Sequence, residues 1–243
     1  MVVEVFKSNK LYVASYDLSS DIFQIELASQ RAKKDKTVFG DDTEHSIPGL
    51  FQHTLNHQGY HQADANDFQV DDILDSLNGS VDDIVTVCPT GGAAGELAYF
   101  LKSMETEYGL IGQVGEIFAF RLSAEGVSEM VRGTVMNNSA LTATGTGTAR
   151  QLGAVTADQK VYAAMHVTAV SGTNPTLDMV LQSDDAEGMA SATSRITFAQ
   201  ATAITSEWLT ADGPITDDWW LPSFTVGGTD TPSFTVILVV GIQ

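Results

Sequence analysis

The pattern of apolar and polar positions predicts a chain built mainly of short β-strands. From residue 161 onward, stretches rich in Val, Ile, Thr and aromatic residues are bounded by Gly, Pro, Asn or Asp. Several short strands at this spacing are typical of an antiparallel sandwich or barrel. The stretches are VYAAMHVTAVSG, TLDMVLQSDD, RITFAQAT, SEWLTADGPITDDWWLPSFTVGG and SFTVILVVGIQ. The phrase SFTV occurs at 223–226 and 233–236, on either side of GGTDTP, which predicts two neighbouring strands of one hairpin.

Strand patterns also occupy the N-terminal part of the chain. In DIFQIEL, the apolar residues Phe23, Ile25 and Leu27 alternate with Gln24 and Glu26, as a half-buried strand requires. The other expected strands are VVEVF, LYVASYDL, FQHTLNHQGY, DDIVTVCP, GEIFAFRLSAEG and SEMVRGTVM.

Two short helices are expected between these strands. The first follows Asp67, whose side chain can cap a helix, and ends at Asn78-Gly79. Its apolar face consists of Val70, Ile73, Leu74 and Leu77. The second is expected to begin near residues 94–96 and to end at Gly109, because its apolar positions recur at helical spacing. Those positions are Leu97, Phe100, Leu101, Met104 and Tyr108.

The polar and Gly/Thr-rich stretch at residues 138–155 differs in composition from both of its flanks. Such a change favours a domain boundary. We therefore expect two domains, residues 1–145 and residues 146–243.

Charge is distributed unevenly along the chain. The formal net charge is −19, from 12 basic and 31 acidic residues. Residues 1–36 hold six basic and five acidic residues (+1), whereas residues 37–243 hold six and 26 (−20). A surface this acidic repels nucleic acid. The contrast between the two segments could also drive head-to-tail contact between copies.

The longest polar connection is RAKKDKTVFGDDTEHSIPGL, residues 31–50, which is punctuated by Gly40, Pro48 and Gly49. We expect a loop here. Connections of this length between β elements are usually functional or disordered.

Four histidines lie close together in the sequence, namely His45, His53, His57 and His61. The last three are four residues apart, so they would share one face of a helix or of a strand and could hold a metal. Gly59 and β-type alternation argue against a helix. We favour an exposed polar face over a metal site, because no HExxH motif or cysteine pair supports a metal.

The segment PTGGAAG, residues 89–95, is similar to a phosphate-binding loop. A Walker-type loop needs Lys and then Ser or Thr after its last glycine, but Glu96 and Leu97 follow here. A flexible turn between a strand and a helix is favoured instead.

Acidic pairs recur without the spacing of a calcium loop, and solvated turn residues are the favoured interpretation. Incidental cation binding at Ser183–Gly188 is the alternative at one pair. The pairs are Asp41-Asp42, Asp71-Asp72, Asp82-Asp83, Asp184-Asp185 and Asp217-Asp218.

Aromatic and sulfur-containing residues are further candidates for chemistry. Trp208, Trp219 and Trp220 could stack on sugars, although a sandwich core also uses large aromatics. Adjacent strand residues point to opposite faces, so Trp219 or Trp220 is expected to face solvent or a partner. Cys88 lies in an apolar run without an adjacent base, which favours a buried, inert thiol. We expect no enzyme, no cofactor and no metal site.

The N-terminus has no charged segment followed by an apolar core. The longest apolar run, Phe234–Ile242, is far shorter than the ~20 residues that a spanning helix needs. We therefore expect a soluble protein that is made in a cytoplasm.

The order of these elements resembles that of major tail tube proteins of long-tailed, siphovirus-like bacterial or archaeal viruses. The resemblance rests on the N-terminal strands, the charged loop with a GD…IPGL phrase (Gly40–Leu50), the GELAYF segment and the strand VGEIFAFRLSAEG. The C-terminal stretches HVTAVSGTNPTLDMVLQSDD and WWLPSFTVGGTDTPSFTVILVVG resemble the β-sandwich modules of virion proteins. The resemblance to tail tube proteins implies an antiparallel tail-tube fold in the first domain. It also implies a C-terminal Ig-like sandwich, which would be either a decoration or a second tube-like half.

The resemblance also implies a mechanism. Subunits would form hexameric rings, or trimeric pseudo-hexameric ones, that stack into a hollow tube in the virion tail. A long loop would stitch neighbouring rings together. Its residues here would be Arg31, Lys33, Lys34, Lys36, Phe39, Asp41 and Asp42. Further partners would be a tape measure protein, a tail terminator and distal tail or baseplate proteins. Viral DNA would pass through the lumen without specific binding, and no membrane would be bound.

Two other classes of protein compete with this interpretation. One is another virion component, such as a head decoration or a tail-terminator-like protein. The other is a carbohydrate- or receptor-binding sandwich, which would need Trp219 or Trp220 as an exposed aromatic platform. The long charged loop favours the tail tube, because tubes need such a loop and isolated decorations do not.

Overall fold

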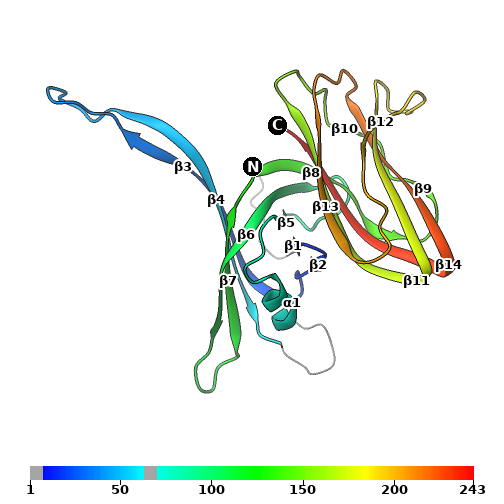
Figure 1. Cartoon of the computed structure of the whole chain (residues 1–243), viewed down its shortest axis with the longest axis horizontal. Helices are drawn as coiled ribbons and strands as arrows, with labels where there is room; N and C mark the ends of the chain where they lie inside the picture. The colour runs from blue at the N-terminus through cyan, green and yellow to red at the C-terminus, as the bar shows by residue number, and fades with distance from the viewer. Residues whose placement is uncertain (1–7, 63–69) are drawn as a thin grey trace. The chain divides into compact units, whose positions relative to one another are not determined.

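The computed structural model describes residues 8–62 and 70–243. As expected, this part of the chain is mainly β, with one helix (Figure 1), and strand pairs such as β11–β14 and β3–β4 are antiparallel. The first eight strands are β1 (Lys10–Val13), β2 (Tyr16–Asp17), β3 (Ile22–Asp35), β4 (Ser46–Tyr60), β5 (Asp83–Cys88), β6 (Leu97–Ile111), β7 (Ala119–Gly126) and β8 (Val131–Leu141). The other strands are β9 (Gly145–Thr146), β10 (Arg150–Gln151), β11 (Lys160–Asp184), β12 (Thr193–Thr197), β13 (Thr205–Asp212) and β14 (Trp219–Ile242). The helix is α1 (Val70–Leu77).

The chain forms two compact units that interleave along the sequence. Unit 1 comprises Met1–Ser20, Ile84–Leu101 and Val131–Gln243, and unit 2 comprises Asp21–Asp83 and Lys102–Met130. The predicted boundary between residues 145 and 146 falls inside unit 1, because β8, before that boundary, pairs with β14, after it. That residues 1–145 and residues 146–243 fold independently stays a prediction.

Unit 1 is organised around the two longest strands. β11 and β14 pair from Val161↔Ile242 to Asp184↔Trp219. On its other side β11 pairs with β13 near its start and with β12 near its end. β14 pairs with β8, β9 and β10. Beyond β8 the order continues through β6, β5, β1 and β2.

The run VYAAMHV in β11 is apolar because both of its faces are buried. Val161, Ala163, Met165 and Val167 pack into one cluster, together with residues such as Leu238 and Val240. Tyr162 and Ala164 pack into another cluster, with Tyr12 and Phe100. Since successive strand residues point to opposite faces, a strand covered on both sides needs a continuous apolar sequence.

The one polar residue of this run, His166, is fully buried and hydrogen-bonded at both ring nitrogens. Nδ1–H donates to the Ala14 carbonyl at 2.6 Å, so Nε2 accepts from the Thr86 hydroxyl at 2.8 Å. Burial lowers the pKa of His166 to about 4, which keeps the ring neutral. The histidine thus ties β11 to β5 and to the turn after β1. A lone histidine in an apolar run carries no motif, so no sequence pattern indicates this role.

Unit 2 is a sheet with the order β3–β4–β7–β6 and the helix α1. β4 pairs with β7 from Thr54↔Glu125 to Tyr60↔Ala119, and β7 pairs with β6 from Ser103↔Gly126 to Ile111↔Ala119. The expected apolar face of α1 is confirmed, since Val70, Ile73, Leu74 and Leu77 are all buried. The expected N-cap, Asp67, and the expected strand VVEVF lie outside the described residues.

The second expected helix is wrong, because residues 97–111 form strand β6. Leu97–Phe100 pair with β8, and β5 lies on the other side of β6 in the sheet. Ala98, Phe100 and Leu101 are all buried, as in an interior strand. A short apolar run fits both the helical and the strand period, so pairing with neighbouring strands decides which structure forms. The turn PTGGAAG therefore connects two strands, not a strand and a helix.

The expected hairpin between the two SFTV phrases is also wrong, because both phrases lie in β14. Phe224 pairs with Met179, and Phe234 pairs with Val170. Each phrase therefore pairs with β11 and not with the other. The register between β11 and β14 shifts on both sides of Thr173, which pairs with Thr229 in the segment GGTDTP of β14. The C-terminal Ig-like sandwich stays a prediction.

Candidate assembly interface

The outer part of the β3–β4 hairpin extends beyond the sheet of unit 2 (Figure 1). β7 reaches β4 only at residues 54–60, whereas β3 and β4 pair with each other as far as Asp35↔Ser46. We call residues 29–52 the distal hairpin. Every residue from 29 to 48 is exposed. This part of the ladder is therefore covered on neither face within the described residues.

One face of the distal hairpin continues a face that is buried nearer the core. Residues directly opposite each other in a ladder share a face, as do residues two apart along a strand. The successive pairs on this face are Ile25↔His57, Leu27↔Leu55, Ser29↔His53 and Arg31↔Phe51. His57 and Leu55 are buried, but Phe51 is 61% exposed. This face therefore still carries a large apolar side chain, Phe51, beyond the residues of β4 that pair with β7.

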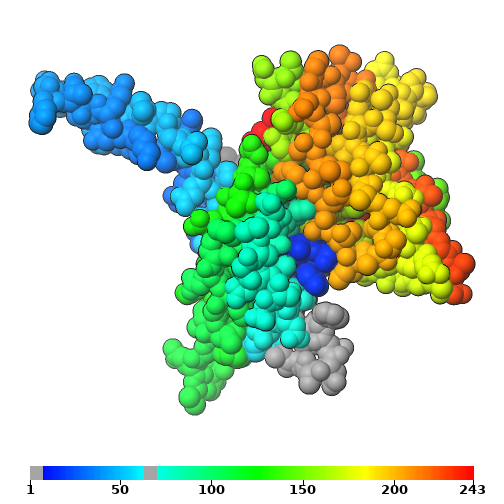
Figure 2. Space-filling model, viewed as in Figure 1, coloured from blue at the N-terminus to red at the C-terminus, as the bar shows by residue number. Residues whose placement is uncertain are grey.

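Exposed apolar side chains gather on the distal hairpin, which stands clear in the space-filling view (Figure 2). Leu50 is 86% exposed, and Phe39 at the tip is fully exposed. Val38 and Ile47 are also exposed. Large exposed apolar residues in one place mark interaction sites. The Arg31 guanidinium lies 5.0 Å from the centre of the Phe51 ring, so a cation covers part of this surface.

Polar contacts organise the tip of the hairpin. Asp35 accepts hydrogen bonds from the Thr37 backbone N–H (2.8 Å) and hydroxyl (2.6 Å), which lower the pKa of Asp35. The Lys36 N–H donates to the His45 carbonyl at 2.9 Å and extends the ladder by one step. Asp41 accepts from the Val38 N–H at 3.0 Å. The expectation of a long loop is therefore wrong for half of residues 31–50, namely 31–35 and 46–50, which belong to β3 and β4. Polar strands can form here because neither face is buried, so no alternation is required.

The seven predicted assembly residues all lie on the distal hairpin. Arg31, Lys33 and Lys34 belong to β3, and the other four lie in the connection to β4, namely Lys36, Phe39, Asp41 and Asp42. Lys33 pairs with Glu44 at 2.9 Å. Within the described residues, Lys34 and Lys36 have no ion-pair partner. Their role in assembly stays a prediction.

Charge is segregated within the distal hairpin. Residues 29–36 and 46–52 carry Arg31, Lys33, Lys34 and Lys36 against Asp35, for +3. Residues 37–45 carry Asp41, Asp42 and Glu44, for −3. All of the positive charge lies on residues 31–36, residues 46–52 carry no charge, and the tip is anionic.

The expected exposed polar face is wrong for His57 in β4, whereas His53 and His61 are half-buried. His57 is fully buried, and its ring meets Phe120 edge-on with centroids 5.9 Å apart. Burial lowers the pKa of His57 to about 4. Neither of its ring nitrogens has a hydrogen-bond partner in the described part of the chain. Among the residues described, no group of side chains is arranged to hold a metal ion.

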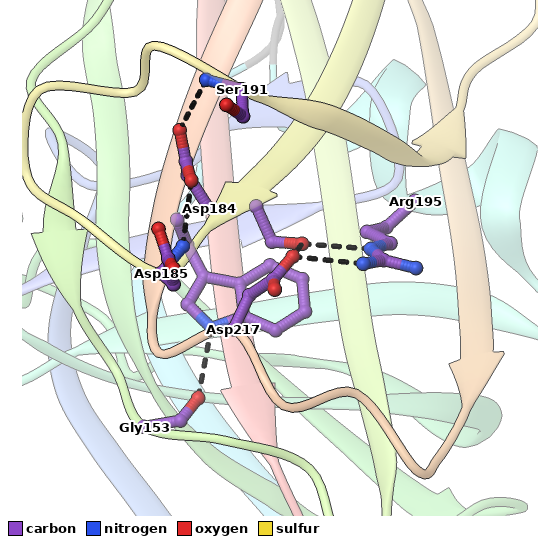
Figure 3. A network of polar contacts seen from close by, with 8 residues as sticks. Gly153, Asp184, Asp185, Ser191, Arg195 and Asp217 are labelled. Atoms are coloured by element: carbon purple, nitrogen blue, oxygen red, sulfur yellow. Dashed lines mark hydrogen bonds and ion pairs between the residues drawn. The ribbon is translucent and has the colours of Figure 1, made fainter.

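The Asp184-Asp185 and Asp217-Asp218 pairs contribute to a polar network in unit 1 (Figure 3). Asp184 is buried and accepts N–H groups from Asp185 (2.8 Å) and Ser191 (2.7 Å). Asp217 accepts from the Ser183 hydroxyl (2.7 Å) and from Arg195 (2.8 Å), and these bonds lower the pKa of Asp217. For Asp184, the interpretation as a solvated turn residue is therefore wrong. Its oxygens accept from backbone donors that close the loop after β11.

The other candidates are mostly parts of the core. Trp220 is fully buried and donates to the Gly153 carbonyl at 2.9 Å, whereas Trp219 is half-buried. Trp208 packs on Phe100 with ring centroids 5.1 Å apart. The prediction of a buried thiol at Cys88 is confirmed, and burial raises its pKa to about 12. In the described part of the chain, no helix is long and apolar enough to cross a membrane.

Comparisons with known proteins find similarity only among solved structures. No family model matches the chain, and no curated protein matches it. A chain in the virion of a native gene transfer agent is 12% identical, with a TM-score of 0.39, and the match covers 53% of this chain and 97% of that one. The Dit protein of phage SPP1, described as a hub adsorption apparatus, is 9% identical, with a TM-score of 0.40 and coverage of 98% and 100%. A chain of the PVC sheath–tube complex, an extracellular contractile injection system, is 11% identical, with a TM-score of 0.39 and coverage of 55% and 93%. These values do not assign the chain to a family.

Proposed function

We propose that this chain is a structural subunit of a virus tail, and specifically a tail tube protein that assembles into stacked rings. The observation that carries the proposal is the distal hairpin. It presents an apolar and cationic face that continues the core of unit 2 but that no described part of the chain covers. A second copy of the chain would bury that face. The matched structures come from a virion, a phage hub and an injection system, but the proposal rests on the hairpin.

The outer edge of β3 offers a second mode of contact, between neighbours in one ring. Among the described residues, β3 pairs only with β4, so the backbone groups along its 14 residues face outward on the other edge. Unpaired strand edges are templates for pairing with another chain. A strand from a neighbouring copy would extend the sheet of unit 2 around the ring.

The acidic character of the chain suits passage of DNA through such a tube. With a net charge of −19, the wall would repel phosphates and not bind them. The remaining partners in this proposal are a tape measure protein, a tail terminator and distal tail proteins. The proposal assigns no catalytic role to the chain.

Electron microscopy of the purified protein at several salt concentrations tests the proposal. We expect uniform hollow tubes with a regular axial repeat, and weaker assembly at high salt because ionic contacts are screened. A variant with Arg31, Lys33, Lys34 and Lys36 all replaced by Gln should stay folded and lose the tubes. The matched control replaces Lys102, Arg121, Arg132 and Lys160 by Gln and should still form tubes.

Two results would count against the tail tube. If the hairpin variant assembles like the unmodified chain, the hairpin does not drive assembly. If the unmodified chain stays monomeric at every salt concentration, a head decoration or a receptor-binding module becomes the better interpretation.

A further inference from the structure

A second exposed apolar surface lies at the opposite end of unit 2 from the hairpin tip. The connection between β6 and β7, with the residues beside it, carries five exposed apolar side chains. Val114 is fully exposed and Ile117 is 71% exposed. The others are Leu110, Ile111 and Phe118. A patch of this kind marks an interaction site.

This patch is joined to the start of α1. The His61 N–H donates to the Phe118 carbonyl at 3.0 Å, so the end of β4 meets the start of β7. His61 Nδ1 lies 3.5 Å from Asp71 Oδ1, and the Tyr108 hydroxyl donates to Asp71. These contacts bring β4, β6, β7 and α1 together at one end of the unit. We call residues 110–118, with Asp72 and Asp75, the acceptor end.

The acceptor end is acidic. Asp72 and Asp75 on α1 and Glu116 in the β6–β7 connection are exposed. Neither residues 70–83 nor residues 110–118 contain any Lys or Arg. On the distal hairpin, Arg31, Lys34 and Lys36 form no ion pair with a carboxylate within the described residues. The two ends of unit 2 therefore match each other, because each combines exposed apolar side chains with unpaired charge, and the charges are of opposite sign.

The two ends cannot meet within one chain. β4 runs from the hairpin, at Ser46, to the acceptor end, at Tyr60. At about 3.3 Å per residue, this strand separates the ends by roughly 45 Å. Because β4 is paired along this length, the hairpin cannot fold back onto its own acceptor end.

We propose that the acceptor end of one copy receives the distal hairpin of a second copy. Phe39 and Phe51 would pack on Val114 and Ile117. Arg31, Lys34 and Lys36 would face Asp72, Asp75 and Glu116. A head-to-tail contact between different surfaces builds an open stack when its rotation does not close a ring, and the proposed stacking of rings requires a contact of that open kind. The inference rests on the proposed tail tube function and adds the surface on which the hairpin docks.

Charge reversal at each end tests the pairing. One variant carries Asp72→Lys, Asp75→Lys and Glu116→Lys, a second carries Arg31→Glu, Lys34→Glu and Lys36→Glu, and a third carries all six changes. Light scattering gives the protein concentration at which assembly begins, and circular dichroism confirms folding. We expect each triple variant to raise that concentration at least about tenfold and the six-fold variant to recover most of the loss. A control that reverses three other exposed carboxylates, at Glu129, Asp158 and Glu187, should assemble normally.

The outcomes separate this inference from the proposed function. If only the hairpin triple loses assembly, the hairpin docks elsewhere and this inference is overturned while the proposed function stands. If neither triple loses assembly, both are overturned. Two losses without recovery in the six-fold variant overturn the pairing of the two ends.

A second variant covers the case in which reversal on α1 disturbs folding. Val114→Ser with Ile117→Ser removes apolar surface from an exposed turn and leaves the helix unchanged. We expect it to raise the assembly concentration several-fold. An unchanged concentration would show that this patch does not receive the hairpin.

Discussion

β11–β14 in unit 1 and the distal hairpin in unit 2 are both long antiparallel strand pairs, but they differ in what covers them. Residues 161–167 of β11 are buried on both faces by two hydrophobic clusters. Residues 29–48 of the hairpin are exposed throughout. The first pair is stabilised by its own unit. The second pair has the same secondary structure without a core, and under the proposed function a second copy of the chain would cover it.

The largest expected effect on folding is in the fully covered strand pair. Phe234 in β14 is completely buried in the main cluster of unit 1. Phe234→Ala should lower the free energy of unfolding by about 3–5 kcal/mol, because it removes buried apolar surface and leaves a cavity. Urea denaturation of the monomer measures this loss. A change below about 1 kcal/mol would mean that this cluster is not the core of unit 1.

The next effect uses the buried histidines, one in each unit. Burial holds the pKa of His57 and of His166 at about 4, whereas an unfolded histidine titrates near 6.5. Below pH 6.5 the unfolded chain therefore binds more protons than the folded chain. Stability should be complete above pH 6.5 and fall by up to about 1.4 kcal/mol per pH unit for each histidine between pH 6.5 and 4. His57→Phe should remove one part of this dependence, and an unchanged slope would place His57 in contact with water.

A smaller effect of opposite sign comes from Glu105 in β6. Burial, and then the charges of Asp83 and Asp75, raise its pKa to about 7. The folded chain therefore holds this proton more tightly than the unfolded chain, so stability is lost as the pH rises from about 4.5 through 7. Glu105→Gln should stabilise the monomer by about 1 kcal/mol at pH 8 and have little effect at pH 4.5. Equal effects at both values would contradict the assignment.

The smallest expected effect on folding is in the uncovered strand pair. Phe51→Ala should change the free energy of unfolding of the monomer by no more than about 0.5 kcal/mol, because Phe51 is mostly exposed. The same substitution should clearly weaken assembly. Phe51→Ala and Phe234→Ala therefore form a matched pair: the first should weaken assembly, and the second should lower the stability of the monomer. A large loss of monomer stability would show that the hairpin is already covered within its own chain.

The sequence predicted the β-rich class, the helix at residues 70–77 and the buried thiol because each leaves a local pattern. It failed where pairing between distant segments decides the structure. Leu97, Phe100 and Leu101 fit a helical stripe, yet neighbouring strands make them part of β6. The charged residues near Lys34 suggested a loop, because a strand pair without a buried face shows no alternation.

The resemblance to tail tube proteins singled out the cationic residues and Phe39 as an assembly site. They lie on one exposed hairpin, and their role in assembly stays a prediction. The acceptor end was not identified. Its members come from α1 and from the β6–β7 connection, at residues 72–75 and 110–118. No sequence pattern shows that segments so far apart share one surface.

Hydrogen exchange on assembled and dissociated protein tests most directly whether a second copy covers the hairpin. Exchange reports which backbone amides are protected from opening and from solvent. We predict that residues 29–52 and 110–118 gain protection on assembly, whereas residues 161–167 of β11 are equally protected in both states. Assemblies in which the distal hairpin exchanges as fast as in the free chain would contradict the account.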